Sequence, residues 1–139
     1  MEKIKENFMR KAIEDAKKNS QKYGAVVVKG NEVIAKSGNR PKNDFRFHAE
    51  TQAILNAGKD LSNCSLYSTC EPCPMCFYMA WATGIKEIYY GATIKDSVAT
   101  GVPEMNISVK ELNKKSGNKI KLFGNFLRSE CLDLLKCYD

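Results

Sequence analysis

Three side chains of the kind that bind metal ions lie in two segments that are far apart in this sequence. His48 is the only histidine, and it precedes the pair Cys73-x-x-Cys76 by 25 residues. Imidazole and thiolate groups are typical zinc ligands, and zinc takes four protein ligands in a structural site or three plus a water molecule in a catalytic site. If one ion uses all three residues, the fold must bring both segments to one point.

Both segments coincide with predicted helix starts. An apolar run predicts a helix over residues 73–83, so that Cys73 and Cys76 fall on its first turn. The free N–H groups and the positive end of the helix dipole there favour thiolates, the form of cysteine that binds metal. His48 precedes a second predicted helix over residues 49–57. In this interpretation two helix starts face a single ion.

Glu50 follows the histidine by two positions. Three protein ligands suffice for a catalytic zinc site, so Glu50 is not needed to hold the ion. We expect it beside the open coordination position, where a side chain that moves protons belongs. Two other interpretations stay open, because a Cys-x-x-Cys pair also occurs in structural zinc sites and in redox pairs. A redox pair, however, leaves His48 and Glu50 without a role.

Cys70 extends the pair to a run in which Cys70, Cys73 and Cys76 are separated by two residues each. Such a run resembles an iron–sulfur pattern, which requires a further cysteine four positions later, followed by proline. Ala80 and Trp81 occupy those positions. The run therefore does not predict a cluster, and we expect Trp81, within this apolar helix, in the core.

Outside these segments, helix and strand patterns alternate along the chain. The turn Gly30-Asn31 predicts a hairpin between strands over residues 24–29 and 32–36. The other expected elements are helices over residues 3–19, 108–114 and 127–137, strands over 65–69, 86–91 and 119–123, and a loop over 37–46. The alternation predicts an α/β layer structure, and the length of 139 residues fits one domain over residues 1–139.

The composition limits the class of protein. A hydrophobic fraction of 43% and a charged fraction of 27% are ordinary for a soluble globular protein. The longest largely apolar stretch, residues 76–85, is too short for a bilayer core of about 30 Å, and no secretory signal is visible. We therefore expect a cytoplasmic protein with no membrane partner, whose six cysteines stay reduced. The net charge of +6 suits either a nucleic-acid partner or a solvated lysine-rich surface.

The motif His48-Ala49-Glu50 and the run Glu71-Pro72-Cys73-Pro74-Met75-Cys76 resemble the superfamily of zinc-dependent nucleoside and nucleobase deaminases. The resemblance is good over about residues 24–94 and looser elsewhere. It implies a three-layer α/β/α sandwich around a mixed five-stranded sheet, as in cytidine deaminase. It also implies zinc bound by His48, Cys73 and Cys76, with Glu50 as the proton shuttle. Homodimers are common in the superfamily, where a tail residue such as Tyr138 either closes a neighbouring site or is disordered.

Within that superfamily, the run from Cys70 to Cys76 is most similar to guanine deaminases. Asn39 matches an asparagine that contacts the base in guanine deaminases and in bacterial tRNA adenosine deaminases, although a role in a turn is its alternative. Guanine deaminases often carry Gly-Phe-Asp-Asp after the fourth strand, and the corresponding stretch here is Gly101-Val102-Pro103-Glu104. The resemblance therefore implies substrate contacts at Asn39, Ala49 and Glu104.

Other features leave the substrate open. The tail Leu127-Arg128-Ser129-Glu130-Cys131 is more similar to the tRNA enzymes. Phe45 and Phe47 either stack on a base, wall the pocket, or pack in the core or a dimer contact. We expect a small-molecule substrate, guanine or a related purine, with tRNA adenosine as the alternative and cytosine or cytidine as a third choice. A non-enzymatic zinc module is the alternative from another class, and it requires four protein ligands.

Overall fold

A mixed five-stranded sheet forms the middle layer of the protein, in the order β2-β1-β3-β4-β5. The structure is a computed structural model that describes residues 2–137, so Tyr138 lies outside the described residues. The strands are β1 (Ala25–Lys29), β2 (Glu32–Lys36), β3 (Cys64–Cys70), β4 (Glu87–Ala92) and β5 (Lys121–Phe123). β1 runs antiparallel to β2 and β3, whereas β3, β4 and β5 are parallel. The expected mixed sheet is confirmed.

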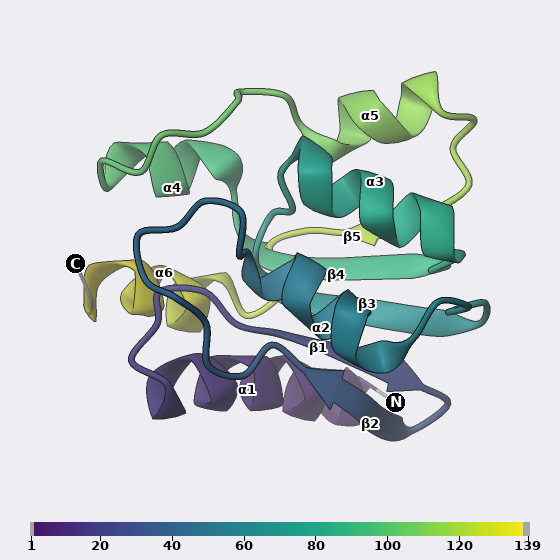
Figure 1. Cartoon of the computed structure of the whole chain (residues 1–139), viewed down its shortest axis with the longest axis horizontal. Coiled ribbons are helices and arrows are strands. Elements are labelled where there is room, and N and C mark those ends of the chain that lie inside the picture. Colours follow the sequence, from purple (N-terminus) through teal and green to yellow (C-terminus); the bar gives the residue numbers. More distant parts are fainter. Residues whose placement is uncertain (1, 138–139) are drawn as a thin grey trace.

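Helices cover both faces of this sheet (Figure 1). They are α1 (Glu2–Lys18), α2 (Ala49–Ala57), α3 (Pro74–Thr83), α4 (Ile94–Ala99), α5 (Val109–Lys115) and α6 (Arg128–Cys137). α1 and α6 share an apolar core with one face, and α2, α3 and α5 share a second core with the other. The three-layer α/β/α sandwich is therefore confirmed.

β1 shows why the sheet has a core on each side. Val26 and Val28 join the apolar cluster under α1 and α6, while Ala25 and Val27 join the cluster under α2 and α3. Successive strand residues point to opposite faces, so a strand covered on both sides is a continuous apolar run.

On β4, Gly91 permits the close approach of α6, because a Cβ there would overlap the side chain of Cys131.

The sequence patterns did not predict α4. This helix has six residues, of which only Ile94 and Ser97 are buried, so no apolar period reveals it. Its local signal is a capping box, in which the Thr93 hydroxyl accepts from the Asp96 N–H and the Asp96 carboxylate accepts from the Thr93 N–H. Arg128 of α6 also donates to both Asp96 oxygens, at 2.6 and 2.9 Å. These contacts hold a short helix that sequence propensity alone does not stabilise.

Smaller expectations have mixed outcomes. The prediction that Trp81 lies in the core is wrong, because α3 buries Cys76, Phe77 and Ala80 and leaves Trp81 37% exposed. β5 begins at Lys121 rather than at residue 119. All six cysteines, which lie within the described residues, carry free thiols. Across residues 2–137, no helix combines the length and the apolar character needed to cross a membrane.

Candidate active site

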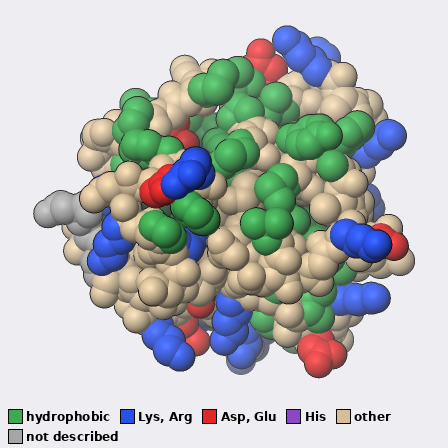
Figure 2. Space-filling view, viewed as in Figure 1, with side chains coloured by type: hydrophobic (Ala, Val, Ile, Leu, Met, Phe, Trp, Pro, Cys, Tyr) green, Lys and Arg blue, Asp and Glu red, His purple; other side chains and the backbone are tan. Residues whose placement is uncertain are grey.

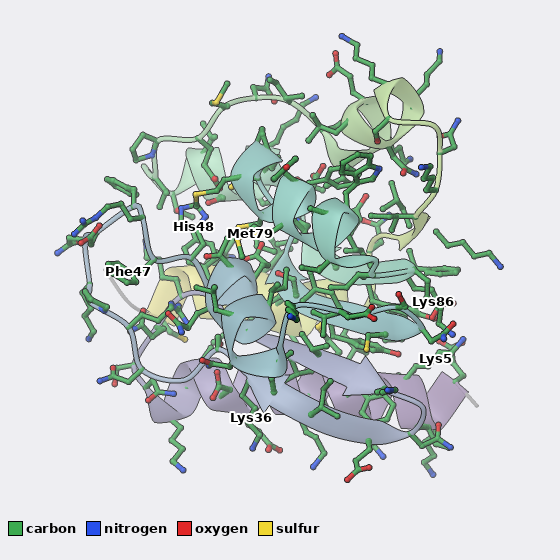
Figure 3. All side chains as sticks on the ribbon, turned by 45° about the vertical axis from the view of Figure 1, so that its right-hand side comes forward. Lys5, Lys36, Phe47, His48, Met79 and Lys86 are labelled. Atoms are coloured by element: carbon green, nitrogen blue, oxygen red, sulfur yellow. The ribbon has the colours of Figure 1, made fainter. Side chains whose placement is uncertain are left out.

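His48, Cys73 and Cys76 come together where α2 and α3 begin. His48 is the N-cap residue of α2 and Cys73 is the N-cap residue of α3, both with extended backbone. The His48 Nδ1 atom lies 3.4 Å from the Cys73 Sγ atom and 3.5 Å from the Cys76 Sγ atom, and the two sulfurs are 3.6 Å apart. Figure 3 shows the ring of His48 beside sulfur atoms. The two helix starts therefore face each other, as the sequence predicted.

These three distances match those that a tetrahedral zinc ion imposes on its ligands. Zn–S bonds of about 2.3 Å and Zn–N bonds of about 2.0–2.1 Å place two sulfurs about 3.8 Å apart, and a sulfur and a nitrogen about 3.6 Å apart. All three ligand atoms lie within 4.8 Å of one another. Within residues 2–137, no further cysteine or acidic residue belongs to this group, so it has three members. The donor set fits zinc with three protein ligands, the number found in catalytic sites.

Hydrogen bonds within this group favour the thiolate of Cys73. The contacts with the Cys76 thiol and with His48 lower the pKa of Cys73 to about 4, although burial acts in the opposite direction. The contact with Cys73 in turn raises the pKa of His48 to about 8. A thiolate is the form of cysteine that binds metal, and metal binding displaces the remaining ligand protons. Only Cys73 favours its thiolate in this way, because the contact with Cys73 raises the pKa of the Cys76 thiol, so a divalent cation must displace the Cys76 proton when it binds.

Glu50 lies in the first turn of α2 with only 5% of its surface exposed. Burial raises the pKa of Glu50 to about 7, and the neighbouring Cys73 charge acts in the same direction. A carboxyl group whose pKa is close to the ambient pH can both accept and release a proton. Glu50 is thus suited to carry protons beside the metal-ligand group.

A pocket of about 410 Å³ opens over this group, and both His48 and Glu50 line it. Its walls come from residues 20–23, from the loop before α2, from the turn between β3 and α3, and from residues 100–104. Of the three residues expected at the substrate, Ala49 and Glu104 line this pocket. Asn39 is exposed and is not among the residues that line it, so its contact with substrate stays a prediction.

Arg40, to which the sequence patterns assigned no role, holds the loop before α2 in place. Its side chain is buried and donates to Gln21 Oε1 at 3.2 Å and to the Tyr23 carbonyl at 3.0 Å. The Gln21 amide donates back to the Arg40 carbonyl at 3.1 Å.

On the same loop, Phe45 and Phe47 line the pocket and are 60% and 38% exposed. These two phenylalanines therefore wall the pocket and do not pack in the core.

The opposite wall is the segment from α4 to α5, and Glu71 anchors both of its ends. The buried Glu71 carboxylate accepts from the Ile94 N–H at 3.1 Å and from the Val109 N–H at 2.9 Å. Because Glu71 lies two residues before Cys73, one turn presents a thiolate and also holds this wall. No sequence pattern predicts these contacts, since they join residues 23 and 38 positions apart.

Comparisons with known proteins agree with this geometry. Residues 2–92 match the family model described as the cytidine and deoxycytidylate deaminase zinc-binding region. The guanine deaminase of Bacillus subtilis (strain 168) is 37% identical in an alignment of 99 positions that covers 66% of this chain and 63% of that protein, slightly less than two thirds of its length. The tRNA-specific adenosine deaminase of the same organism is 30% identical in an alignment of 144 positions that covers 96% of this chain and 87% of that protein.

A solved structure agrees as well. The structure of guanine deaminase from Nitrosomonas europaea has a TM-score of 0.83 and 25% sequence identity, and the match covers 94% of this chain and 82% of that one. The matched family region includes all three candidate ligands, so zinc is the cofactor that both the family and the local geometry indicate. The chain belongs to the cytidine and deoxycytidylate deaminase family, the zinc-binding region of which it carries in residues 2–92.

Proposed function

We propose that the protein is a hydrolytic deaminase of a free purine base, preferably guanine, with zinc held by His48, Cys73 and Cys76. The observation that carries this proposal is the buried carboxyl of Glu50 beside a three-ligand group at a pocket of about 410 Å³. A structural zinc module needs four protein ligands and no adjacent proton carrier. The three-ligand group therefore favours an enzyme over a non-enzymatic module.

The reaction requires several proton transfers, and Glu50 is the residue placed to make them. A zinc ion held by His48, Cys73 and Cys76 would lower the pKa of a water molecule from 15.7 to about 7 and would so supply a nucleophile at neutral pH. Glu50 accepts one proton from the attacking water molecule, whose oxygen bonds to the ring carbon that bears the amino group, and delivers this proton to the adjacent ring nitrogen. It then carries the remaining hydroxyl proton to the departing amino group. Water and the aminopurine thus become the oxopurine and ammonia.

The carboxylate of Glu104 complements the hydrogen-bond donors of guanine better than those of adenine, and so favours guanine as the substrate. Guanine presents a ring N–H next to its amino group, so two donors face one edge, and a carboxylate accepts both. Adenine presents a ring-nitrogen acceptor beside its amino group, which a carboxylate does not match. Ala49, buried between His48 and Glu50, leaves room for a flat ring at the pocket wall. The similarity to two guanine deaminases supports the same choice.

A tRNA adenosine is the second candidate, and specific observations favour it. Lys22 and Lys42 line the pocket without an ion-pair partner among the described residues, and the chain carries a net charge of +6. Phosphate groups of RNA are attracted to such a surface. The exposed ring of Phe45 at the pocket offers a surface on which a splayed base stacks. The tRNA-specific relative also aligns over nearly the whole chain.

An ammonia-release assay on the purified zinc-loaded protein tests this ranking. The panel consists of guanine, guanosine, adenine, cytosine, cytidine and a tRNA anticodon stem-loop. We expect turnover of guanine and none of the tRNA, because Glu104 complements the donor edge of the free base. Turnover of the stem-loop with inert guanine would reverse the order of the two candidates. Absence of ammonia from every compound would refute the deaminase proposal.

We further propose that the protein forms a homodimer through the outer surface of α2 and α3. Four large apolar side chains are exposed there, namely Leu55 (65%), Met75 (41%), Tyr78 (62%) and Trp81 (37%). α3 contains no charged residue, and the one charged residue of α2, Glu50, is buried. Figure 2 shows hydrophobic side chains gathered on this face of the molecule. A helix that is apolar on all sides is normally buried on all sides, so a second copy is the fitting cover.

A charge placed on this surface is expected to prevent dimer formation. Tyr78→Glu introduces a carboxylate that an apolar contact desolvates without a partner, which costs several kcal/mol and lowers the association constant by at least about 10²-fold. Sedimentation velocity of both proteins measures the change. Ile4→Glu is the matched control, because Ile4 is 39% exposed on α1, on the opposite side of the sheet, and should leave the dimer intact. A wild-type protein that sediments as a monomer at all concentrations would contradict the proposal.

A further inference from the structure

Asp15 is a buried acidic residue that the proposed reaction does not use. It lies near the C-terminal end of α1 with 8% of its surface exposed. Burial of a charged group is costly, and the helix dipole disfavours a negative charge near the C-terminal end of a helix. None of the ion pairs formed within residues 2–137 includes Asp15. Hydrogen bonds from other parts of the chain must therefore compensate for its charge.

These hydrogen bonds come from the point at which β2 ends and the loop before α2 begins. The Ser37 hydroxyl donates to the Asp15 Oδ2 atom at 2.5 Å, and the Gly38 N–H donates to the same atom at 2.9 Å. The Ser37 hydroxyl in turn accepts from the Ala25 N–H of β1 at 3.2 Å. Gly38 has a φ of 66°, so the chain turns here in a conformation that favours glycine. The carboxylate therefore fixes the place and the direction of this turn.

The remainder of the loop is placed by its two ends. Among the hydrogen bonds of the described residues, those made by residues 41–47 all remain within that stretch. At its far end the loop joins His48, which belongs to the metal-ligand group. Figure 1 shows the loop between β2 and α2 arching outward beside the end of α1. The path of the loop thus depends on its start, which Asp15 and Arg40 hold.

Phe45 makes the path of this loop important for binding. Its ring is 60% exposed and lines the pocket. Flat rings stack favourably only within a narrow range of positions, with centroids about 4.5–7 Å apart. A displaced loop would carry the ring out of that range. Asp15 does not line the pocket, so it acts on a bound base only through the loop.

We propose that Asp15 is a positioning residue that holds the loop before α2 so that the Phe45 ring covers the bound base. This inference rests on the deaminase function proposed above. It goes beyond that function, because it assigns a part of base binding to a ring outside the metal-ligand group and the placement of this ring to a residue of α1. The hydrogen bonds of Asp15 reach neither Glu50 nor the metal-ligand group, so Asp15 affects base binding and not the proton transfers.

Asp15→Ala tests the proposal in the full-length, zinc-loaded protein. We expect KM for the best substrate of the panel to rise by about 10-fold, since the ring no longer meets the base in one orientation, while kcat changes by less than about threefold. Asp15→Asn keeps one acceptor oxygen for the Gly38 N–H and should show a smaller rise. Zinc content should equal that of the wild type in both variants.

Asn113→Ala is the matched control. Asn113 is also buried, and its side chain holds a different loop through two hydrogen bonds to the backbone of Ile120, at 2.7 and 3.2 Å. It does not line the pocket. This variant should lose stability without a change in KM. An equal rise of KM in Asn113→Ala would overturn the inference, because loss of stability alone would then account for the effect.

Limited proteolysis reports on the loop without an activity assay. Lys42 and Arg46 are exposed in it, and trypsin cuts after both residues when the chain opens locally. We expect cleavage at these two positions to be about 10-fold faster in Asp15→Ala than in the wild type, and unchanged in Asn113→Ala. Mass spectrometry of the fragments identifies the bonds that are cut. Equal rates in Asp15→Ala and the wild type would show that Asp15 does not hold the loop.

A double-mutant cycle with Phe45→Ala shows whether Asp15 acts through the ring. If it does, Asp15→Ala raises KM by less than about twofold once Phe45 is already alanine. An equal rise in both backgrounds would overturn the inference, as would an Asp15→Ala protein with the KM of a wild type that releases ammonia. A wild type that deaminates no compound of the panel overturns the proposed function instead, and the proteolysis still decides whether Asp15 holds the loop.

Discussion

Glu50→Gln is expected to lower kcat by at least about 10²-fold to 10⁴-fold while the protein keeps its zinc. The amide has the same shape as the carboxyl group but neither accepts nor releases a proton at neutral pH, so the transfers to the ring nitrogen and to ammonia lose their carrier. Burial raises the pKa of Glu50 to about 7, so a neutral amide fits this site without loss of stability. Ammonia release, metal content and thermal melting measure the three quantities.

Glu111→Gln is a suitable control for this variant. Glu111 lies on the exposed side of α5 and does not line the pocket, so its amide should keep wild-type turnover. A Glu50→Gln protein with near-wild-type turnover and full zinc content would remove Glu50 from the mechanism. Loss of zinc from that variant would instead assign Glu50 a role in holding the metal.

Cys73→Ala and Cys76→Ala are each expected to abolish both stoichiometric zinc and measurable turnover. Removing one thiolate leaves two protein ligands of the three, and even outer-shell changes at zinc sites cost 10-fold to 10²-fold in affinity, so the loss should exceed about 10²-fold. Because bound zinc stabilises only the folded state, these variants and the chelator-treated wild type should also melt at lower temperature than the zinc-loaded protein. Elemental analysis and calorimetry measure both effects.

Cys131→Ala controls for the loss of a buried thiol as such. Cys131 is fully buried on α6, against the other face of the sheet, and is not part of the metal-ligand group. It should retain one zinc ion per chain and full turnover, with only the modest instability of a truncated core side chain. A Cys73→Ala protein that still holds stoichiometric zinc would contradict the ligand assignment.

Much of the fold was predictable because its signals are local. The helices over 2–18 and 49–57 and the hairpin at Gly30-Asn31 were predicted within a few residues, since periodicity and turn chemistry depend on neighbours in sequence. α4 was not predicted, because a helix of six residues with two buried positions shows no detectable helical period of apolar residues. Its capping box was the one local signal. Trp81 was misplaced because an apolar helix does not by itself show which of its sides the sheet covers.

The sequence by itself determined the chemistry of the metal-ligand group. His48 with Glu50, and Cys73 with Cys76, each lie within one turn at a helix start, so their residue types and spacing predict how they meet an ion. Only the tertiary structure decided what surrounds that group. The hydrogen bond between Tyr23 and Ser97 joins residues 74 positions apart, and the one from the Val109 N–H to Glu71 joins residues 38 positions apart. Such contacts depend on how sheet and helices pack, and no pattern of adjacent residues encodes them.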